Sequence, residues 1–255
     1  MSGPDTDRPE TRGRPRYRET VSRMGGAQKS SKGGAAYSVY VNRRLGRWAA
    51  AAAFTAGLTP NAVTGISAVF SFAGIAVIAL VSGWAAAVAA PLLAIGYFLD
   101  SADGQLARLR GGGSPAGEWL DHMVDSVKIT TLPLAVLIHL YRFTDLDTGW
   151  LLVPMGYLVV AVALFFAQLL NEQLRRNSQL PGTVAPIERA SPVSAFLKLP
   201  HDYGLLCWVF VLLGAPRVFL AAYGFLFAFN AGYLALALIK WYREMRALTP
   251  REKTT

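Results

Sequence analysis

Long apolar segments, separated by short connections that contain glycine, proline or aspartate, occupy most of the chain after residue 60. An α-helix needs about 20 residues to cross a bilayer core about 30 Å thick, because each residue advances it by about 1.5 Å. Six segments approach or reach this length: 62–82, 84–99, 120–141, 150–170, 199–213 and 218–239. The second and fifth are short, so each is expected to extend into flanking polar sequence. The pattern predicts an all-α integral membrane protein with six transmembrane helices.

A different periodicity precedes the first of these segments. Apolar side chains recur there at helical spacing, and three arginines fall on the other face. The apolar positions are Val41, Leu45, Trp48, Ala49 and Ala52, and the basic ones are Arg43, Arg44 and Arg47. This predicts an amphipathic helix over 37–57 that lies in the membrane interface. The alternative is an N-terminal extension of the first transmembrane helix, but Pro60 favours a break.

The composition agrees with a membrane protein. Apolar residues make up 53% of the chain and charged residues only 16%, against about 25% charged in soluble domains. The mean hydropathy is +0.33. This composition excludes a disordered chain, and the single cysteine, Cys207, excludes a secreted scaffold held by disulfides within the chain.

The net charge of +9 is a feature of the two ends of the chain. Residues 1–50 carry eleven basic and four acidic residues, residues 240–255 carry five and two, and the part between them has a net charge of −1. From Trp48 to Leu99 no residue carries a formal charge. A basic nucleic-acid-binding protein is therefore disfavoured, and the basic ends are expected to orient a membrane protein.

Six spans place both termini on the same side, and the positive-inside rule assigns that side to the cytoplasm. Two polar loops on this side carry Arg108, Arg110, Arg175, Arg176, Arg189 and Lys198, whereas the opposite loops carry only Arg142 and Arg217. The predicted organisation is a disordered basic cytoplasmic tail over 1–36, the interfacial helix over 37–57, a six-helix catalytic domain over 58–240 and a second basic cytoplasmic tail over 241–255.

Four aspartates interrupt the apolar pattern where the second predicted span ends and the third begins. Asp100 and Asp103 are three residues apart, and Asp121 and Asp125 are four apart, so each pair lies on one face of its helix. The short connection between the two helices makes them antiparallel neighbours and places both pairs at the same cytoplasmic depth. Charges inside a membrane are costly, and such residues indicate a functional site. The alternative is that these aspartates only cap helix ends.

Four converging carboxylates would repel one another unless cations neutralised them. Oxygen ligands without a cysteine cluster favour a hard ion, Mg²⁺ or Mn²⁺, and four carboxylates suit two such ions. The connection between the pairs adds a phosphate-binding arginine, Arg108, small residues at Gly104 and Ala107, and a glycine-rich turn that ends at Ser114. Carboxylates, an arginine and a glycine-rich turn together indicate a diphosphate ligand.

The motif residues are Asp100, Asp103, Gly104, Ala107, Arg108, Gly117, Asp121 and Asp125. They reproduce every position and spacing of D-x2-D-G-x2-A-R-x8-G-x3-D-x3-D, so the sequence resembles the CDP-alcohol phosphotransferase family. The resemblance covers about residues 38–240 and includes the Thr59, Pro60, Asn61 and Ala62 segment. It implies that Asp100, Asp103 and Asp121 ligate two divalent ions, and that Asp125 joins the second ion and acts as general base. It implies a CDP-binding set of Thr59, Pro60, Asn61, Ala62, Gly104, Ala107, Arg108, Ser114 and Gly117, and a homodimer.

The turn from Arg110 to Ser114 resembles that of actinobacterial phosphatidylinositol-phosphate synthases. This favours CDP-diacylglycerol as the donor, a small polar alcohol such as inositol phosphate or glycerol phosphate as the acceptor, and a bacterial cell membrane as the location. The lysine of the acceptor pattern in those enzymes is absent from 168–176, which counts against a phosphorylated acceptor. Arg175, Arg176 and Lys128 are the residues that would replace it. Positive-inside charges and a lysine that reaches the interface are the alternatives.

Two other functions compete with phosphatidyl transfer. A headgroup transferase of the same superfamily would move a CDP-activated choline or ethanolamine phosphate onto a lipid hydroxyl. A cation transporter would use the aspartates as an ion pathway, but it has no use for Arg108 and the glycine-rich turn. His122 is expected to serve in packing, and His201 and Asp202 either shape the acceptor pocket or cap a helix.

Overall fold

The computed structural model describes residues 17, 21, 35–178, 196 and 198–248. Its elements follow in the order η1 (Ser38–Asn42), α2 (Arg43–Thr55), α3 (Pro60–Leu80), η2 (Gly83–Val88), α4 (Ala89–Leu109), α5 (Pro115–Phe143), η3 (Thr148–Leu151), α6 (Leu152–Asn177), η4 (Leu199–His201), α8 (Tyr203–Val209), η5 (Phe210–Gly214) and α9 (Pro216–Leu248). No strand occurs in these ranges, which confirms the all-α fold. Most of the predicted 1–36 tail, residues 249–255 and Arg189 lie outside the described residues.

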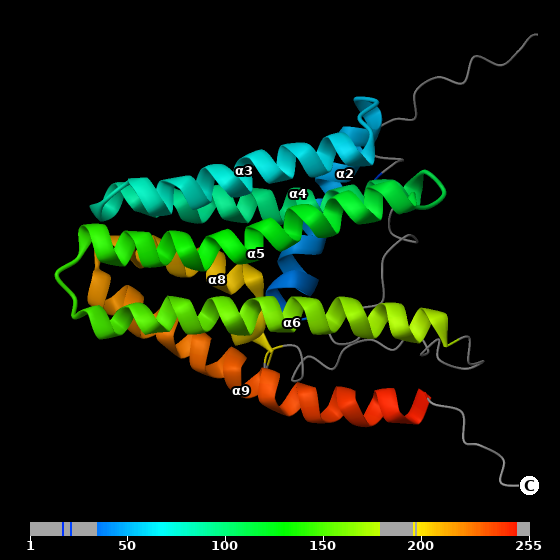
Figure 1. Cartoon of the computed structure of the whole chain (residues 1–255). Coiled ribbons are helices and arrows are strands. Elements are labelled where there is room, and N and C mark those ends of the chain that lie inside the picture. Colours follow the sequence, from blue (N-terminus) through cyan, green and yellow to red (C-terminus); the bar gives the residue numbers. More distant parts are fainter. Residues whose placement is uncertain (1–16, 18–20, 22–34, 179–195, 197, 249–255) are drawn as a thin grey trace, which may run out of the picture.

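Five of the six predicted spans are helices long and apolar enough to cross a membrane. They are Pro60–Leu80, Gly83–Leu109, Pro115–Phe143, Thr148–Asn177 and Pro216–Ala247. The second span reaches this length because its helix continues through the acidic motif to Leu109. The fifth remains a shorter apolar helix, Tyr203–Gly214. Figure 1 shows the long helices running side by side, with α8 among them.

Two helices of the site begin in the same way. Thr59 caps α3 by accepting a hydrogen bond from the amide of Ala62 at 3.2 Å, and Ser114 caps α5 by accepting one from Gly117 at 3.1 Å. Each cap is followed by a proline, which has no amide hydrogen to leave unpaired in the first turn. The turn that leads into α5 contains Gly111 and Gly112 at φ of 99° and 126°, a backbone region that favours glycine.

The helices α3 and α4 approach closely along small and polar residues. Ser67 donates a hydrogen bond to the carbonyl of Gly96 at 2.8 Å. A Cβ atom at Gly96 would lie 2.2 Å from Ser71 Oγ, so a larger residue does not fit between the helices. This contact fixes α4 one turn before the acidic motif begins.

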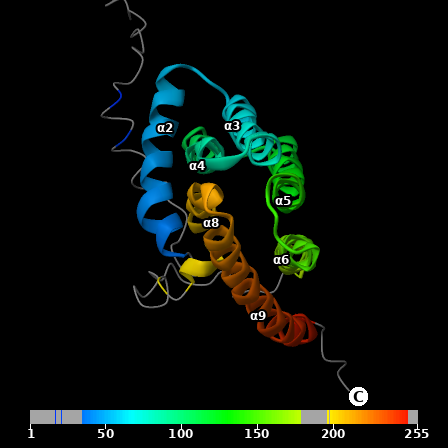
Figure 2. The ribbon, with the colours of Figure 1, turned by 90° about the vertical axis from the view of Figure 1, so that its left-hand side faces the viewer.

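The amphipathic helix lies across the bundle, as Figure 2 shows where α3, α5 and α6 are seen nearly along their axes. A stripe of small residues, Gly46, Ala50 and Ala53, is buried, and α2 packs against α4. The predicted apolar face points outward, because Val41 is 39% and Trp48 54% exposed. The chain turns between Thr55 and Pro60, so α2 is separate from α3, as Pro60 predicted.

Candidate active site

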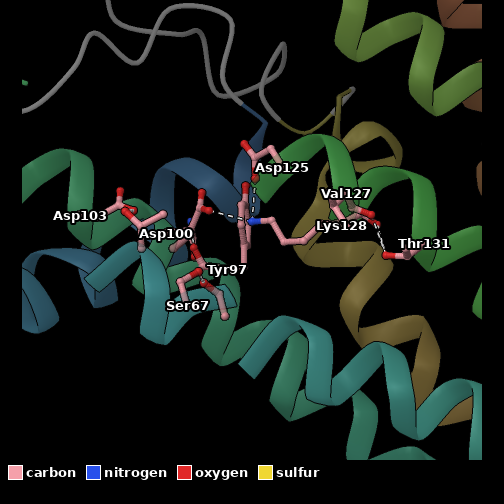
Figure 3. Close-up of polar contacts among 11 residues, drawn as sticks. Ser67, Tyr97, Asp100, Asp103, Asp125, Val127, Lys128 and Thr131 are labelled. Carbon is pink, nitrogen blue, oxygen red and sulfur yellow. Dashed lines mark hydrogen bonds and ion pairs between the residues drawn. The ribbon is translucent and has the colours of Figure 1, made fainter. Parts of the chain in front are cut away.

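Carboxylates from two neighbouring helices converge beside the turn that joins α4 to α5. Asp100 comes from α4, and Asp121 and Asp125 come from α5. One oxygen from each lies within 4.8 Å of the others, and all three side chains are partly buried. We call this set the carboxylate group. Figure 3 shows Asp100 and Asp125 facing each other across the gap between the helices.

The fourth aspartate of the motif points to a different partner. Asp103 Oδ2 accepts a hydrogen bond from Thr64 Oγ1 of α3 at 2.5 Å, and both residues are buried. Asp103 is not one of the three carboxylates that lie within 4.8 Å of one another. Sequence reasoning did not single out Thr64. The available signal was its position one helical turn after Pro60, just beyond the Thr59–Ala62 segment that the family resemblance assigns to CDP binding.

A lysine ammonium lies between two members of the carboxylate group. Lys128 Nζ is 2.7 Å from Asp100 Oδ1 and 2.6 Å from Asp125 Oδ1, and the residue is only 6% exposed. Figure 3 shows the side chain reaching from α5 toward both carboxylates. Ionised carboxylates at this spacing repel one another, and one ammonium offsets only one of the three charges. Two negative charges therefore remain, which equals the charge of one divalent cation.

The donor set of the carboxylate group fits a hard divalent cation. All three ligands are carboxylate oxygens from facing helices, and they lie close enough together to share an ion. Mg²⁺ and Mn²⁺ prefer such oxygen ligands, whereas softer metals prefer sulfur and imidazole.

A polar cavity of about 620 Å³ adjoins the carboxylate group at Asp121. It lies among the first turn of α3, the end of α4, the glycine-rich turn, the start of α5 and the end of α6. Eight of the nine predicted CDP-binding residues line it: Thr59, Pro60, Asn61, Gly104, Ala107, Arg108, Ser114 and Gly117. The exception, Ala62, contributes its amide to the Thr59 cap. A Cβ atom at Gly117 would lie 3.1 Å from Asn61 Oδ1, so a side chain there would crowd the wall of the cavity.

Both arginines and acidic residues line this polar cavity. Arg110 Nη2 donates to the carbonyl of Leu58 at 2.7 Å, and its guanidinium lies 5.8 Å from the centroid of the Phe54 ring. Arg176 of α6 is 2.7 Å from Glu118 Oε1 and 2.6 Å from Glu172 Oε1. Sequence reasoning did not assign Glu118 or Glu172 to the site, because their role depends on α6 lying next to the start of α5.

The structure separates the three residues that were predicted to bind the acceptor. Lys128 lies between Asp100 and Asp125 of the carboxylate group, and Arg176 lines the polar cavity. Arg175 forms an ion pair with Glu244 of α9 instead. His122 lines the polar cavity, with Nε2 3.8 Å from Glu118 Oε1.

A model of the CDP-alcohol phosphatidyltransferase family matches residues 57–238. The chain belongs to this family. It is therefore a transferase that takes a phosphatidyl or phosphoalcohol group from a CDP-alcohol, and the resemblance drawn from the acidic motif is confirmed. Members of the family generally depend on divalent metal ions, and the carboxylate group is suited to hold one. The narrower likeness to phosphatidylinositol-phosphate synthases is not confirmed by this match. No curated protein matches the chain.

Proposed function

We propose that this CDP-alcohol phosphatidyltransferase moves the phosphatidyl group of CDP-diacylglycerol to the hydroxyl of a small polar alcohol and releases CMP. The observation that carries the proposal is the carboxylate group beside a polar cavity lined by the residues of the family motif. The reaction serves phospholipid biosynthesis. The basic ends support a cytoplasmic active site. The resemblance of the glycine-rich turn to actinobacterial enzymes supports a bacterial cell membrane, and the family resemblance supports a homodimer.

The polar cavity would hold the cytidine diphosphate part of the donor. Arg108 supplies a guanidinium for a phosphate, and the glycine-rich turn lets the backbone approach it closely. Asp100, Asp103, Asp121 and Asp125 would hold Mg²⁺ or Mn²⁺, two ions by the number of carboxylates. When bound, these ions would offset the negative charge of the diphosphate.

Asp125 would act as the general base for the acceptor. Its carboxylate takes the proton from the acceptor hydroxyl, and the acceptor oxygen forms a bond to the β-phosphorus. The bond from that phosphorus to the bridging oxygen breaks, and CMP leaves with the electron pair. Lys128, which is 2.6 Å from Asp125 Oδ1, holds this carboxylate in position.

The experiment that tests this proposal is an acceptor screen. Purified protein in detergent is incubated with radiolabelled CDP-diacylglycerol, Mg²⁺ and a panel of small alcohols, and CMP release and the lipid product are measured. We expect CMP release with at least one alcohol of the panel. A parallel incubation contains CDP-choline and diacylglycerol. CMP release in the parallel incubation alone would identify a headgroup transferase and reject phosphatidyl transfer.

Removal of divalent ions is expected to stop the reaction. In excess chelator the charge of the carboxylate group and of the diphosphate would no longer be offset, so CMP release should fall to the background rate. Addition of Mg²⁺ or Mn²⁺ in excess of the chelator should restore it. A rate in chelator equal to the rate with Mg²⁺ would reject a metal-dependent mechanism.

A further inference from the structure

A second cavity, of about 230 Å³, lies between α5, α6, the start of α8 and α9. We call it the apolar cavity because most of its wall is aliphatic or aromatic. Its described lining residues are Ile129, Leu132, Pro133, Tyr157, Ala161, Leu164, Phe165, Gln168, His201, Asp202, Tyr203, Leu206, Tyr223 and Asn230. These residues include neither lysine nor arginine. In Figure 2, α8 and α9 face α5 and α6.

The apolar cavity lies near the carboxylate group, although none of the three carboxylates is among its lining residues. Ile129 lies one helical turn after Asp125 on α5. Tyr203 packs edge to face against Tyr97, with ring centroids 5.1 Å apart, and Tyr97 precedes Asp100 by three residues on α4. None of the lining residues is shared with the polar cavity. The apolar cavity is therefore separate from the polar cavity, and its wall begins about one helical turn from the carboxylate group.

The polar groups of the apolar cavity are amide, hydroxyl and carboxyl groups and the imidazole of His201. Asn230 is buried and donates to the carbonyls of Leu226 and Pro200 at 2.8 Å and 3.1 Å, and its Oδ1 is 2.5 Å from His201 Nδ1. Asp202 accepts hydrogen bonds from the amides of Ser38 and Gly204 at 2.8 Å and 2.9 Å. Burial raises the pKa of Asp202, and its carboxylate repels a phosphate wherever it is ionised. Gln168 adds an exposed amide to the wall.

The three cations that were predicted to bind the acceptor are already paired with carboxylates. Lys128 bridges Asp100 and Asp125, Arg175 pairs with Glu244, and Arg176 pairs with Glu118 and Glu172. A phosphate on the acceptor would have to compete with these acids for their cations.

The direction of attack assigns the cavities to the two substrates. In phosphoryl transfer the attacking and leaving oxygens lie roughly in line on opposite sides of the phosphorus. If the polar cavity holds the nucleotide that leaves, the acceptor oxygen must approach from another side of the carboxylate group. The apolar cavity, whose wall includes Ile129 one helical turn from Asp125, is the cavity that we assign to this approach. At about 30 Å³ per water-sized atom, its volume of about 230 Å³ suits a molecule of about eight non-hydrogen atoms.

We propose that the apolar cavity binds the acceptor alcohol and selects an uncharged acceptor, one that carries no phosphate. The proposal rests on the proposed function and narrows its acceptor to one chemical class. It differs from the expectation of inositol phosphate or glycerol phosphate that the glycine-rich turn suggested. Apolar walls contact the carbon skeleton, and Gln168 is available to bind hydroxyl groups.

Matched acceptor pairs test the proposal directly. CMP release from CDP-diacylglycerol is measured with inositol and inositol 1-phosphate, and with glycerol and glycerol 3-phosphate. We expect kcat/KM to be at least about tenfold higher for the unphosphorylated member of a pair. Equal or faster release with the phosphorylated member would overturn the acceptor class and leave phosphatidyl transfer intact. CMP release only from CDP-choline with diacylglycerol would overturn the proposed function and this assignment with it.

A change of charge in the apolar cavity gives a second readout. Gln168 is exposed and lines this cavity, so Gln168→Lys is expected to fold and to place an ammonium where a phosphate would bind. The ratio of kcat/KM for the phosphorylated to the unphosphorylated acceptor should rise at least about tenfold. Gln173→Lys is the matched control, because Gln173 is exposed on the same helix and lines neither of the two cavities. An equal rise of this ratio in Gln168→Lys and Gln173→Lys would show that the acceptor does not bind in the apolar cavity.

Filling the apolar cavity tests the location without a change of charge. Ala161→Phe places a ring in the cavity and should raise KM for the acceptor at least about tenfold while KM for CDP-diacylglycerol stays the same. Ala163→Phe is the control, since Ala163 is also partly buried on α6 but does not line the cavity. An unchanged acceptor KM in the properly folded Ala161→Phe variant would contradict the assignment, as would an equal rise in KM for both substrates.

Discussion

Asp125 is the residue on which the proposed transfer depends most directly. Asp125→Asn keeps the shape of the side chain but replaces the carboxylate with an amide that cannot take a proton from the acceptor. General-base catalysis contributes about 10²–10⁴-fold, so CMP release should fall at least about 100-fold, while binding of CDP-diacylglycerol remains. Asp145→Asn, in the exposed connection between α5 and α6, should retain the wild-type rate. A wild-type rate in Asp125→Asn would show that another group takes the proton.

Lys128 stabilises the carboxylate group by its positive charge and has no part in the proposed proton transfer. Its ammonium is buried between Asp100 and Asp125, and removal of one partner from a buried ion pair costs about 3–5 kcal/mol because the other charge is left unpaired. Lys128→Met should therefore lower the Tm of the protein in detergent and chelator by at least about 5 °C. Mn²⁺ should raise the Tm more in the variant than in the wild type, because the carboxylates then lack their own cation.

The control for Lys128 is an exposed lysine that also has an acidic partner. Lys240 is 3.7 Å from Glu244 on the surface of α9, where an ion pair contributes about 0–1 kcal/mol. Lys240→Met should leave both the Tm and its response to Mn²⁺ unchanged. Equal Tm values for Lys128→Met and the wild type in chelator would show that the ammonium does not stabilise the carboxylate group.

At the scale of the elements, the contact between α3 and α4 positions the acidic motif. Gly96→Ala places a methyl group 2.2 Å from Ser71 Oγ and would push the two helices apart one turn before Asp100. The Tm and the rate of CMP release should both fall. Gly65→Ala on α3 is the matched control, because its Cβ atom meets nothing within 4 Å. Alanine is the better helix former by about 1 kcal/mol, so this variant should be as stable as the wild type or slightly more stable. Equal Tm values for the two variants would contradict the close packing.

The sequence predicted these elements well where local rules decide them. Thr59 with Pro60 and Ser114 with Pro115 mark the starts of α3 and α5, and both residue pairs are standard helix-start signals. The packing face of α2 was harder to predict. Periodicity selected Val41 and Trp48 for the face toward the membrane interface, and it did not identify the small residues on another face that are buried where α2 packs against α4. Lipid tails are as apolar as leucine, so close approach of backbones rather than hydrophobicity selects the face that packs in a membrane protein.

The candidate site, like the elements, could be predicted from the sequence only where local rules decide its geometry. The spacing of the motif predicted that Asp100, Asp121 and Asp125 come together, because that spacing follows from helical geometry, but it also placed Asp103 with them, which hydrogen-bonds to Thr64 instead. The partners of those residues were not predicted. Thr64 reaches Asp103 from α3, and Glu118 meets Arg176 from α6, 58 residues later in the chain. Such contacts depend on how helices are placed in space, which local spacing does not determine.

At the scale of the whole molecule, the distribution of charge makes a prediction about orientation. The turn between α4 and α5 and the connection between α5 and α6 lie at opposite ends of the bundle, as Figure 1 shows. Gly113 is exposed in the first and Asp145 in the second. If the basic ends are cytoplasmic, the turn that carries Gly113 faces the cytoplasm and the connection that carries Asp145 faces the outside. A single cysteine at each position can therefore report the orientation.

The measurement uses a thiol reagent that does not cross membranes. In intact cells Asp145→Cys should be labelled and Gly113→Cys should not, and both should be labelled once the membranes are opened. A cysteine at position 113 should cause no steric clash, because a Cβ atom at Gly113 meets nothing within 4 Å. The native Cys207 is fully buried, so labelling of the protein without an introduced cysteine should be low. Labelling of Gly113→Cys alone in intact cells would reverse the orientation and place the polar cavity, with its nucleotide-binding residues, outside the cytoplasm that supplies CDP-linked substrates.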